Sequence, residues 1–216
     1  RLLKKINRFP TVVHMNEGHS AFSTLERIRY YLTEHKLSYL EARELIKATT
    51  LFTTHTPVPA GNEMFADDLV HKYLGPFMKE MKMDLENFLN LGRIHSGEKE
   101  QFGMSPFSIR TSAFTNGVSM LHGQVSQSMW KDIWTELYDD EIPIAYVTNG
   151  VHIPTWVSDE FSRLFSRYID PEWMHKIYRK EIWDRIDNIP TNELWKSQER
   201  LKDRLIGFVR TKYYDA

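Results

Sequence analysis

The segment LFTTHTPVPAGNEMF at residues 51–65 constrains the fold of this chain more than any other. Its first residues, 51–54, are apolar or β-branched and predict a short strand. Two prolines and a glycine then predict a loop, because proline has no N–H to donate within a central strand. His55 and Thr56 stand at the turning point, which in an open α/β sheet is the edge where small ligands bind. A structural histidine in a loop is the alternative, and this segment alone leaves both open.

The residues before this strand predict a parallel sheet with helical connections. Residues 11–15 have the pattern of a buried strand, and residues 22–32 carry apolar side chains at helical spacing. Ser20 is the expected cap of that helix, while Ser38 and Glu41 have the spacing of a capping box for a second helix. The order strand, helix, helix, strand favours parallel pairing through a helical crossover, so the expected fold class is α/β.

The sequence after the loop predicts further short helices and a polar segment. A helix at residues 67–74 should end at Gly75, and a second one should be capped by Asp84. We expect an exposed loop at residues 93–103, because this segment is polar and contains two glycines. Residues 107–115 alternate in a way that suits a strand, although a helix is also compatible with them.

The carboxyl-terminal half predicts one more strand among helices. Asn116-Gly117 should form a break, followed by a long helix at residues 118–134 with Leu121 on its apolar side. Residues 144–148 have the clearest later strand pattern, which stops at a second Asn-Gly pair. The remainder should be mostly helical, at residues 158–168, 171–178 and 191–213.

The composition excludes several classes of function. The chain of 216 residues has a net charge of −1 and no basic patch, which argues against nucleic acid or an anionic membrane as a partner. It has no cysteine, which excludes disulfides, thiolate metal sites and cysteine nucleophiles. No apolar run reaches membrane-spanning length, and a cytoplasmic location is the simplest fit. Because the chain begins at Arg1 and not at methionine, we expect an excerpt of a longer protein.

Polar turns follow three of the expected strands, at residues 16–19, 54–56 and 148–150. Amide and imidazole groups both donate and accept hydrogen bonds, which suits sugar hydroxyls, and glycine lets the backbone approach a ligand closely. The sequence contains neither the P-loop nor the dinucleotide-binding fingerprint, so a phosphate cradle is less favoured. We therefore expect a carbohydrate-binding crevice at these strand ends.

The same polar residues fit other kinds of site less well. His14, Glu17 and His19 do not have the spacing of a zinc-binding helix, so no metal site is expected. Glu17 has no carboxylate nearby in sequence with which to form a glycosidase pair. A non-catalytic glucan-binding module would need Tyr146 or Trp156 on its surface as a platform for sugar rings, and we expect both to be buried.

Four segments carry a resemblance to a known family: NEGHSAFSTLERIR, FTTHTPVPAGNEMF, TNGVSMLHGQVSQSMW and VTNGVHIPTW, in this order. With them, the chain resembles the α-glucan phosphorylases, which act on glycogen, starch or maltodextrin. The resemblance extends from about residue 11 to the last helix, and the form THTPVPAG is more similar to the shorter microbial type than to the animal enzymes. The resemblance therefore implies an internal fragment of such an enzyme.

The resemblance implies a fold and an activity for the full-length protein. The fold would be of the glycosyltransferase-B type, with two Rossmann-like domains and the active site between them. Residues 1–150 would be the carboxyl-terminal part of the first domain, and residues 151–216 the helical start of the second. The enzyme would cleave terminal bonds of an α-1,4-glucan with inorganic phosphate, giving glucose 1-phosphate with retention. Pyridoxal phosphate would be its cofactor, and the family is often dimeric, so a homodimer is expected.

The resemblance also assigns roles to individual residues. His55 matches the histidine that contacts the bound glucose, and Asn149 matches the asparagine near the glucose 6-hydroxyl. Asn16, Glu17 and His19 match the turn beside the anomeric side of the sugar, although the animal enzymes usually have aspartate where Glu17 stands. The candidate substrate-binding residues are Asn16, Glu17, His19, His55, Thr56, Asn149 and Gly150, and His55 is also the candidate catalytic residue.

The chain departs from the family pattern in one respect. The lysine that carries pyridoxal phosphate, and the arginine and lysine that hold substrate phosphate, belong to later motifs that this chain lacks. We therefore expect no cofactor-binding residue here and no turnover by the piece alone. A fragment of a nucleotide-sugar glucosyltransferase such as glycogen synthase, or a non-catalytic glucan-binding module, are the alternatives.

Overall fold

The computed structural model describes residues 2–95 and 100–214. The chain divides into two compact units, the first ending at Asn149 and the second beginning at Gly150. Among the described residues, no helix is both long enough and apolar enough to cross a bilayer.

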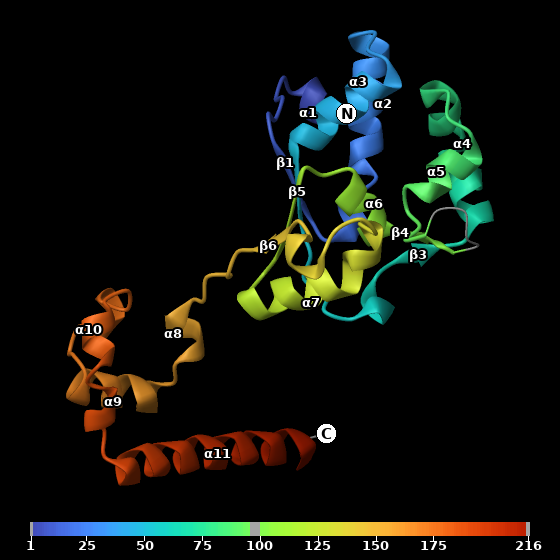
Figure 1. The fold of residues 1–216 in the computed structure, drawn as a ribbon. Coiled ribbons are helices and arrows are strands. Elements are labelled where there is room, and N and C mark those ends of the chain that lie inside the picture. Colours follow the sequence, from blue (N-terminus) through green and yellow to red (C-terminus); the bar gives the residue numbers. More distant parts are fainter. Residues whose placement is uncertain (1, 96–99, 215–216) are drawn as a thin grey trace. The chain divides into compact units, whose positions relative to one another are not determined.

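A parallel sheet of four strands forms the centre of the first unit (Figure 1). Its strands pair in the order β1-β2-β5-β6, and every pairing is parallel. Their bounds are β1 (Val13–Asn16), β2 (Thr50–Thr53), β5 (Phe114–Gly117) and β6 (Ile144–Tyr146). The predicted α/β class and the parallel pairing of the first two strands are confirmed. Because all four strands run in one direction, their carboxyl ends lie along a single edge.

Two helices connect β1 to β2. They are α2 (Ser23–Glu34) and α3 (Tyr39–Ala48), and a short α1 (Leu2–Lys5) precedes β1. The predicted capping box of α3 is confirmed, since the Glu41 carboxylate accepts from the Ser38 N–H at 2.8 Å. The predicted cap at Ser20 is wrong, because residues 18–20 form a separate 3-10 turn and the Ser20 hydroxyl donates to the Glu17 carbonyl.

The connection from β2 to β5 contains the helices α4 (Asp67–Met81), α5 (Leu85–Asn90) and α6 (Met104–Arg110). The predicted end of α4 at Gly75 is wrong, because the helix continues through Pro76. Proline removes one helical hydrogen bond, but Met78 and Met81 beyond it are buried and hold the later turns on the core. The predicted cap of α5 is confirmed, since Asp84 accepts from the Asn87 N–H at 2.8 Å.

The expected exposed loop at 93–103 is wrong at Arg93, Phe102 and Gly103, which are buried, whereas His95 and Gln101 are exposed as expected. Residues 96–99 lie outside the described residues. The Arg93 side chain is only 4% exposed and forms ion pairs with Asp67 at 2.7 Å and Glu86 at 2.6 Å. Two short strands, β3 (Met64–Phe65) and β4 (Phe102–Gly103), pair antiparallel at the end of this segment. The charged side chain of Arg93 can thus be buried, because two carboxylates pair with it.

The segment around β5 also differs from expectation. Residues 107–115, for which the sequence left helix and strand open, contain the end of α6 and the start of β5. Asn116 and Gly117 are buried strand residues and not a break. The next helix, α7 (Met120–Trp130), is shorter than predicted, and Leu121 is 68% exposed. The buried residues of α7 are His122, Gly123, Ser126 and Trp130, and the glycine allows the helix to come close to β6.

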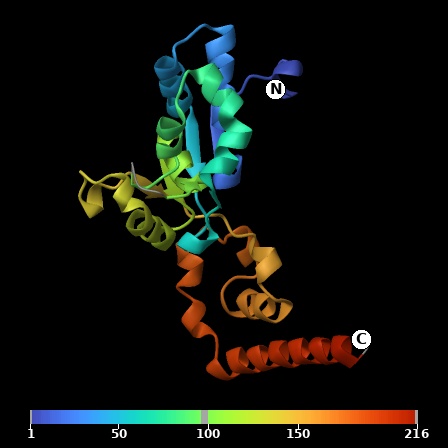
Figure 2. The same ribbon diagram turned by 90° about the vertical axis from the view of Figure 1, so that its right-hand side faces the viewer.

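An aromatic cluster fills the covered side of the sheet. The rings of Phe88 and Phe102 are stacked with centroids 5.5 Å apart, and Phe22 and Phe107 lie against Phe102. The helices α2 and α6 lie on this side (Figures 1 and 2). The opposite face carries exposed residues on neighbouring strands, including Phe114, which is 66% exposed although β5 is a central strand.

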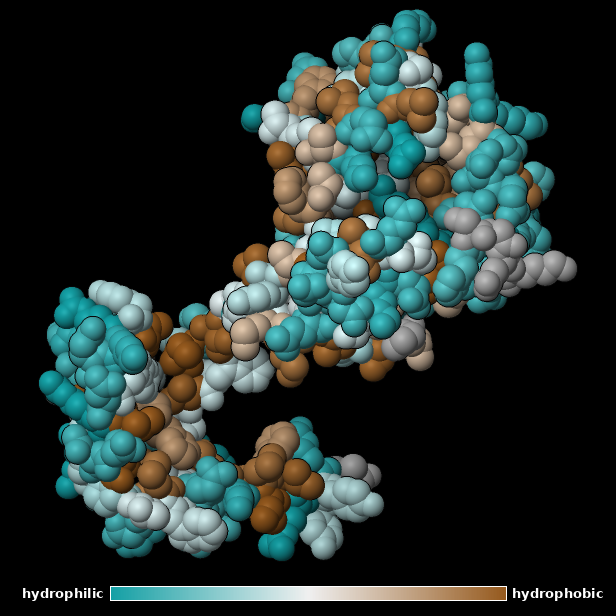
Figure 3. Space-filling model, in the orientation of Figure 1, coloured by the Kyte–Doolittle hydropathy of each residue, from teal (hydrophilic) through white to brown (hydrophobic). Residues whose placement is uncertain are grey.

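The second unit is helical, as expected. It contains α8 (Ile153–Trp156), α9 (Asp159–Tyr168), α10 (Lys180–Trp183) and α11 (Thr191–Tyr214) around a small core centred on Trp173. The helix expected at 171–178 is wrong, because only a single 3-10 turn forms there. Hydrophobic side chains lie on the surface of α11 (Figure 3), where Leu205 and Phe208 are each 62% exposed.

Candidate functional site

The polar turns expected to form a site in the first unit lie at one edge of its sheet. Asn16 is the last residue of β1 and is paired in register with Thr53, the last residue of β2. Asn149 follows β6 by three residues and donates its backbone N–H to the Val118 carbonyl at 3.0 Å. We refer to Asn16, Glu17, His55, Thr56 and Asn149 together as the rim.

Glu17 joins the turn after β1 to the loop after β2. Its Oε1 accepts a hydrogen bond from the backbone N–H of Thr56 at 2.9 Å and another from the backbone N–H of His55. The Thr56 hydroxyl lies 3.4 Å from the same oxygen, and Nδ1 of His55 lies 3.5 Å from it. A carboxylate that accepts from two consecutive N–H groups fixes the backbone on which the His55 side chain stands.

The backbone of Glu17 adopts an unusual conformation to make these contacts. Its φ is 68° and its ψ is 168°, a region that costs a non-glycine residue about 1–3 kcal/mol. The Glu17 N–H donates to the Thr53 carbonyl at 2.9 Å, which continues the β1–β2 ladder up to the bend. The following Gly18 is also constrained, because a Cβ there would lie 3.0 Å from Cβ of Met104. The surrounding contacts therefore hold Glu17 in this conformation.

A chain of side-chain hydrogen bonds crosses the sheet just below the rim. The Thr53 hydroxyl donates to Oδ1 of Asn116 at 2.8 Å, and Nε2 of His14 lies 2.7 Å from the same hydroxyl. Because a hydroxyl has one hydrogen, Nε2 of His14 must be the donor. Nδ2 of Asn116 then donates to the Gly117 carbonyl at 3.0 Å. Three neighbouring strands are thus tied together where the rim begins.

Sequence reasoning missed this chain of hydrogen bonds. It considered His14 only as a metal ligand and assigned Asn116 to a turn. The parallel register of β2 and β5 places Thr53 beside Asn116. Knowledge of this register would have indicated the hydrogen bond between their side chains. Among the described residues, no group of three or more histidine, aspartate or glutamate side chains is arranged to hold a metal ion.

The exposed side chains around the rim can exchange hydrogen bonds with a ligand. Asn16, His19, His55 and Asn149 are exposed, while Glu17 is partly buried and already bonded to the backbone. Amide and imidazole groups of this kind match hydroxyl groups, which also donate and accept. The rim brings Glu17, His55 and Thr56 into direct contact. Asn149 shares the edge two strands further along.

The remaining predicted residue, Gly150, is the first residue of the second unit. It is exposed, and a Cβ placed on it would meet nothing within 4 Å. Among the described residues, none would clash with a side chain at position 150, so packing does not explain the glycine there.

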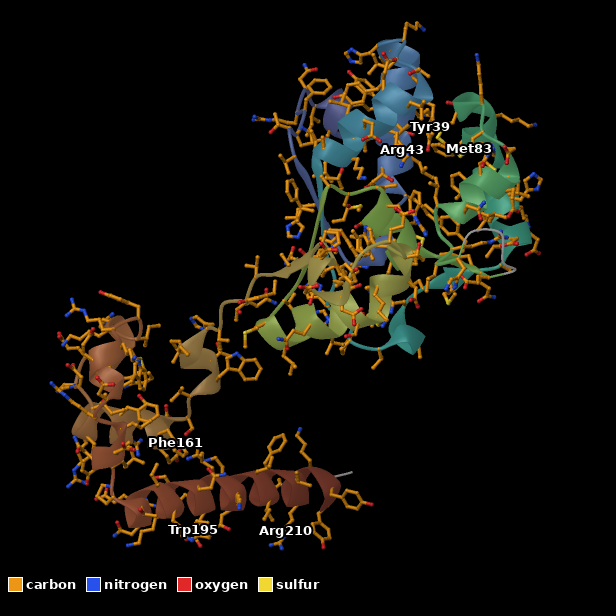
Figure 4. The ribbon with its side chains drawn as sticks, viewed as in Figure 1. Tyr39, Arg43, Met83, Phe161, Trp195 and Arg210 are labelled. Carbon is orange, nitrogen blue, oxygen red and sulfur yellow. The ribbon has the colours of Figure 1, made fainter. Side chains whose placement is uncertain are left out.

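One cavity of the first unit lies away from the rim. It has a volume of about 740 Å³ and lies between α3 and the junction of α4 with α5, where Tyr39, Arg43 and Met83 line it (Figure 4). Burial raises the pKa of the Tyr39 hydroxyl, which stays neutral at physiological pH. Among the described residues, its lining includes none of the rim residues.

Comparison with known proteins identifies the family. The sequence model of the family described as carbohydrate phosphorylase matches residues 3–214. The chain belongs to this family. It is 42% identical over 212 residues to a maltodextrin phosphorylase of Thermococcus litoralis, covering 98% of this chain and 25% of that protein. It is also 34% identical to a glycogen phosphorylase of Mycobacterium tuberculosis, over 94% of this chain and 24% of that protein. A glycogen phosphorylase of Aquifex aeolicus is 32% identical, over 98% of this chain and 30% of that protein.

This chain of the carbohydrate phosphorylase family spans about a quarter of the length of the first two relatives. The resemblance drawn from the four motifs is confirmed, and a glycogen synthase is not favoured. The expected burial of two aromatic residues is wrong, because Tyr146 is 52% exposed and Trp156 is 76% exposed. Tyr146 lies on β6, which is the last strand in the sheet order and has a neighbour on one side only. Trp156 ends the four-residue helix α8 and lies outside the small core of its unit.

Proposed function

We propose that the full-length protein is an α-glucan phosphorylase that cleaves terminal α-1,4-glucosyl bonds with inorganic phosphate. The product is glucose 1-phosphate, formed with retention of configuration. The observation that carries this proposal is the bond from the Glu17 carboxylate to the Thr56 backbone, in a chain of the carbohydrate phosphorylase family. It holds hydroxyl-binding groups of two strand ends beside each other, at the edge where α/β sheets bind ligands.

The residues of the rim, together with His19 and Gly150, would bind the sugar. The exposed ring and the backbone of His55 would contact the glucose, which makes His55 the candidate catalytic residue. Asn149 would bond the region of the 6-hydroxyl, while Asn16 and His19 would line the pocket near the anomeric carbon. Because its carboxylate is already bonded to the loop, Glu17 would act mainly by holding His55 and Thr56 in place. Gly150 would bind the substrate through its own backbone.

The fold of the full-length enzyme would be of the glycosyltransferase-B type. Residues 1–150 would form part of its first Rossmann-like domain, and residues 151–216 would begin the second. The open face of the sheet supports this proposal, because parallel sheets usually have helices on both faces. Phe114 on that face would then be covered by other parts of the first domain.

Pyridoxal phosphate is the proposed cofactor of the full-length enzyme. Its phosphate group would supply acid–base chemistry toward the attacking inorganic phosphate. A lysine that forms a Schiff base is typically desolvated. Every lysine side chain that the structure describes is exposed or partly exposed, so these residues do not fit the attachment site. We place that lysine outside this chain and assign no step of the reaction to a cofactor contact here.

The proposed partners follow from the reaction. They are an α-1,4-glucan, glucose 1-phosphate and inorganic phosphate, with a second copy of the full-length enzyme as a homodimer partner. We also propose a cytoplasmic location, since glucose 1-phosphate is a phosphorylated intermediate used inside cells.

The test is a phosphorolysis assay on the full-length protein, with and without pyridoxal phosphate. Maltodextrin and inorganic phosphate should give the α anomer of glucose 1-phosphate only when the cofactor is present. Chain elongation from a nucleotide sugar, with no phosphorolysis, would contradict the proposal and favour a synthase. Glucan binding without either reaction would favour a non-catalytic module.

A further inference from the structure

The turn between β5 and α7 is built around the imidazole of His122. This side chain lies in the first turn of α7 and is 8% exposed. Its Nδ1 accepts a hydrogen bond from the backbone N–H of Val118 at 3.2 Å. Because Nδ1 accepts, the ring carries its hydrogen on Nε2. Among the described residues, Nε2 has no hydrogen-bond partner. The hydrogen bond from Val118 is therefore the one that the structure shows for the ring.

Two glycines allow the ring and its helix to come this close to the sheet. A Cβ on Gly117 would lie 2.9 Å from Nδ1 of His122, and a Cβ on Gly123 would lie 2.9 Å from Cβ of Tyr146. Ser119 caps the helix by accepting from the His122 N–H at 3.1 Å. Neither glycine can gain a side chain without a shift of the helix, so the ring is held in one place.

The peptide group held by His122 also anchors the segment after β6. The Val118 N–H and the Gly117 carbonyl belong to the same planar peptide. That carbonyl accepts from the Val147 N–H at 3.0 Å, and the next carbonyl, of Val118, accepts from the Asn149 N–H at 3.0 Å. A rotation of this peptide would therefore move the Val147 anchor directly, and it would move the Asn149 anchor through Val118, whose carbonyl belongs to the next peptide.

We propose that His122 is a positioning residue, which sets the place of Asn149 on the rim by fixing the Val118 peptide. This inference rests on the proposed function, in which Asn149 contacts the sugar. The buried ring of His122 acts only through the backbone. Without an acceptor at Nδ1, the Val118 N–H loses its partner, and Val118, whose carbonyl anchors Asn149, is held less firmly.

The matched variants are His122→Asn and His122→Leu in the full-length protein. The two new side chains have nearly the same shape, but only asparagine offers an oxygen close to the place of Nδ1. We expect His122→Leu to lower kcat/KM about tenfold, mainly through a higher KM for glucan and glucose 1-phosphate, and His122→Asn to stay within about threefold.

A control separates positioning from loss of stability. Met129 lies near the far end of α7 and packs against the core. Met129→Ala should lower the melting temperature and leave both KM values unchanged. Equal kinetics for the two His122 variants, or a KM increase of the same size in Met129→Ala, would overturn the inference.

Amide hydrogen exchange on the same full-length variants tests the inference without an activity assay. The amides of Val118 and Asn149 should exchange faster in His122→Leu than in His122→Asn or the wild type. If the wild type shows no phosphorolysis, the proposed function fails, while the exchange still reports on His122. Unchanged exchange at both amides in His122→Leu would overturn the inference even if activity fell.

Discussion

The Glu17 carboxylate accepts a hydrogen bond from the backbone N–H of Thr56 at 2.9 Å, across 39 residues of sequence. Both residues stand just beyond the ends of neighbouring parallel strands. The bond therefore holds the turn after β1 against the loop after β2 and fixes the backbone that carries the His55 side chain. It also explains why a carboxylate is present in a candidate site whose other side chains are amides, a hydroxyl and an imidazole.

Replacing Glu17 by glutamine tests the role of this charge. Glu17→Gln keeps the length of the side chain but exchanges charge-assisted bonds for neutral ones. We expect kcat/KM of the full-length enzyme to fall about tenfold, since roughly 1.5 kcal/mol of positioning is lost. Steady-state kinetics in both reaction directions measure this. The matched control is Glu63→Gln at an exposed position outside the rim, which should keep wild-type kinetics. An equal loss in both variants would show that the Glu17 charge has no special role.

The positive φ of Glu17 leads to a prediction about stability. Glu17→Gly and Glu17→Ala both remove the carboxylate, but only glycine adopts a φ of 68° without steric cost. The glycine variant should therefore be more stable than the alanine variant by about 1 kcal/mol. Thermal unfolding of the two proteins compares them directly. Equal melting temperatures would mean that the backbone at Glu17 relaxes once the side chain is gone.

A third prediction concerns the aromatic cluster and uses two glycines. A Cβ on Gly92 would lie 2.5 Å from the ring of Phe102, so Gly92→Ala should destabilise the protein by about 1–3 kcal/mol. Gly207 lies inside α11 with open space around it, so Gly207→Ala should stabilise that helix by up to about 1 kcal/mol. Relative to the wild type, the melting temperature should fall in Gly92→Ala and rise in Gly207→Ala. A change in the same direction in both variants would refute the packing at Gly92.

The sequence predicts the parallel α/β arrangement of β1 and β2 and the edge that carries the candidate site, because both depend on local patterns. The Ser38 cap and the β-branched strand at Thr50–Thr53 are determined by residues close in sequence. It does not predict the inward turn of Arg93, because the carboxylates that pair with this side chain come from other helices. It also assigned Asn116 to a break, because only the register shows that this amide bonds to Thr53.

The capping box of α3 gives a prediction about pH. The Ser38 hydroxyl and backbone N–H both donate to the Glu41 carboxylate and hold its pKa below the ordinary value for glutamate. A lowered folded-state pKa contributes stability that is present above the unfolded pKa and is lost as the pH falls through the folded one. The stability difference between the wild type and Glu41→Gln should therefore shrink as the pH is lowered through this acidic range. A difference that stays constant with pH would show that Glu41 is not held by Ser38.

The most direct test of the central claim is the kinetics of His55→Ala in the full-length protein, measured for phosphorolysis and for glucan synthesis from glucose 1-phosphate. His71 is an exposed histidine on α4, so His71→Ala is the matched control. We predict that His55→Ala lowers kcat/KM by about one to two powers of ten in both directions, while His71→Ala keeps the wild-type values. Wild-type kinetics in His55→Ala would contradict the account, because the loop held by Glu17 would then play no part in binding the sugar.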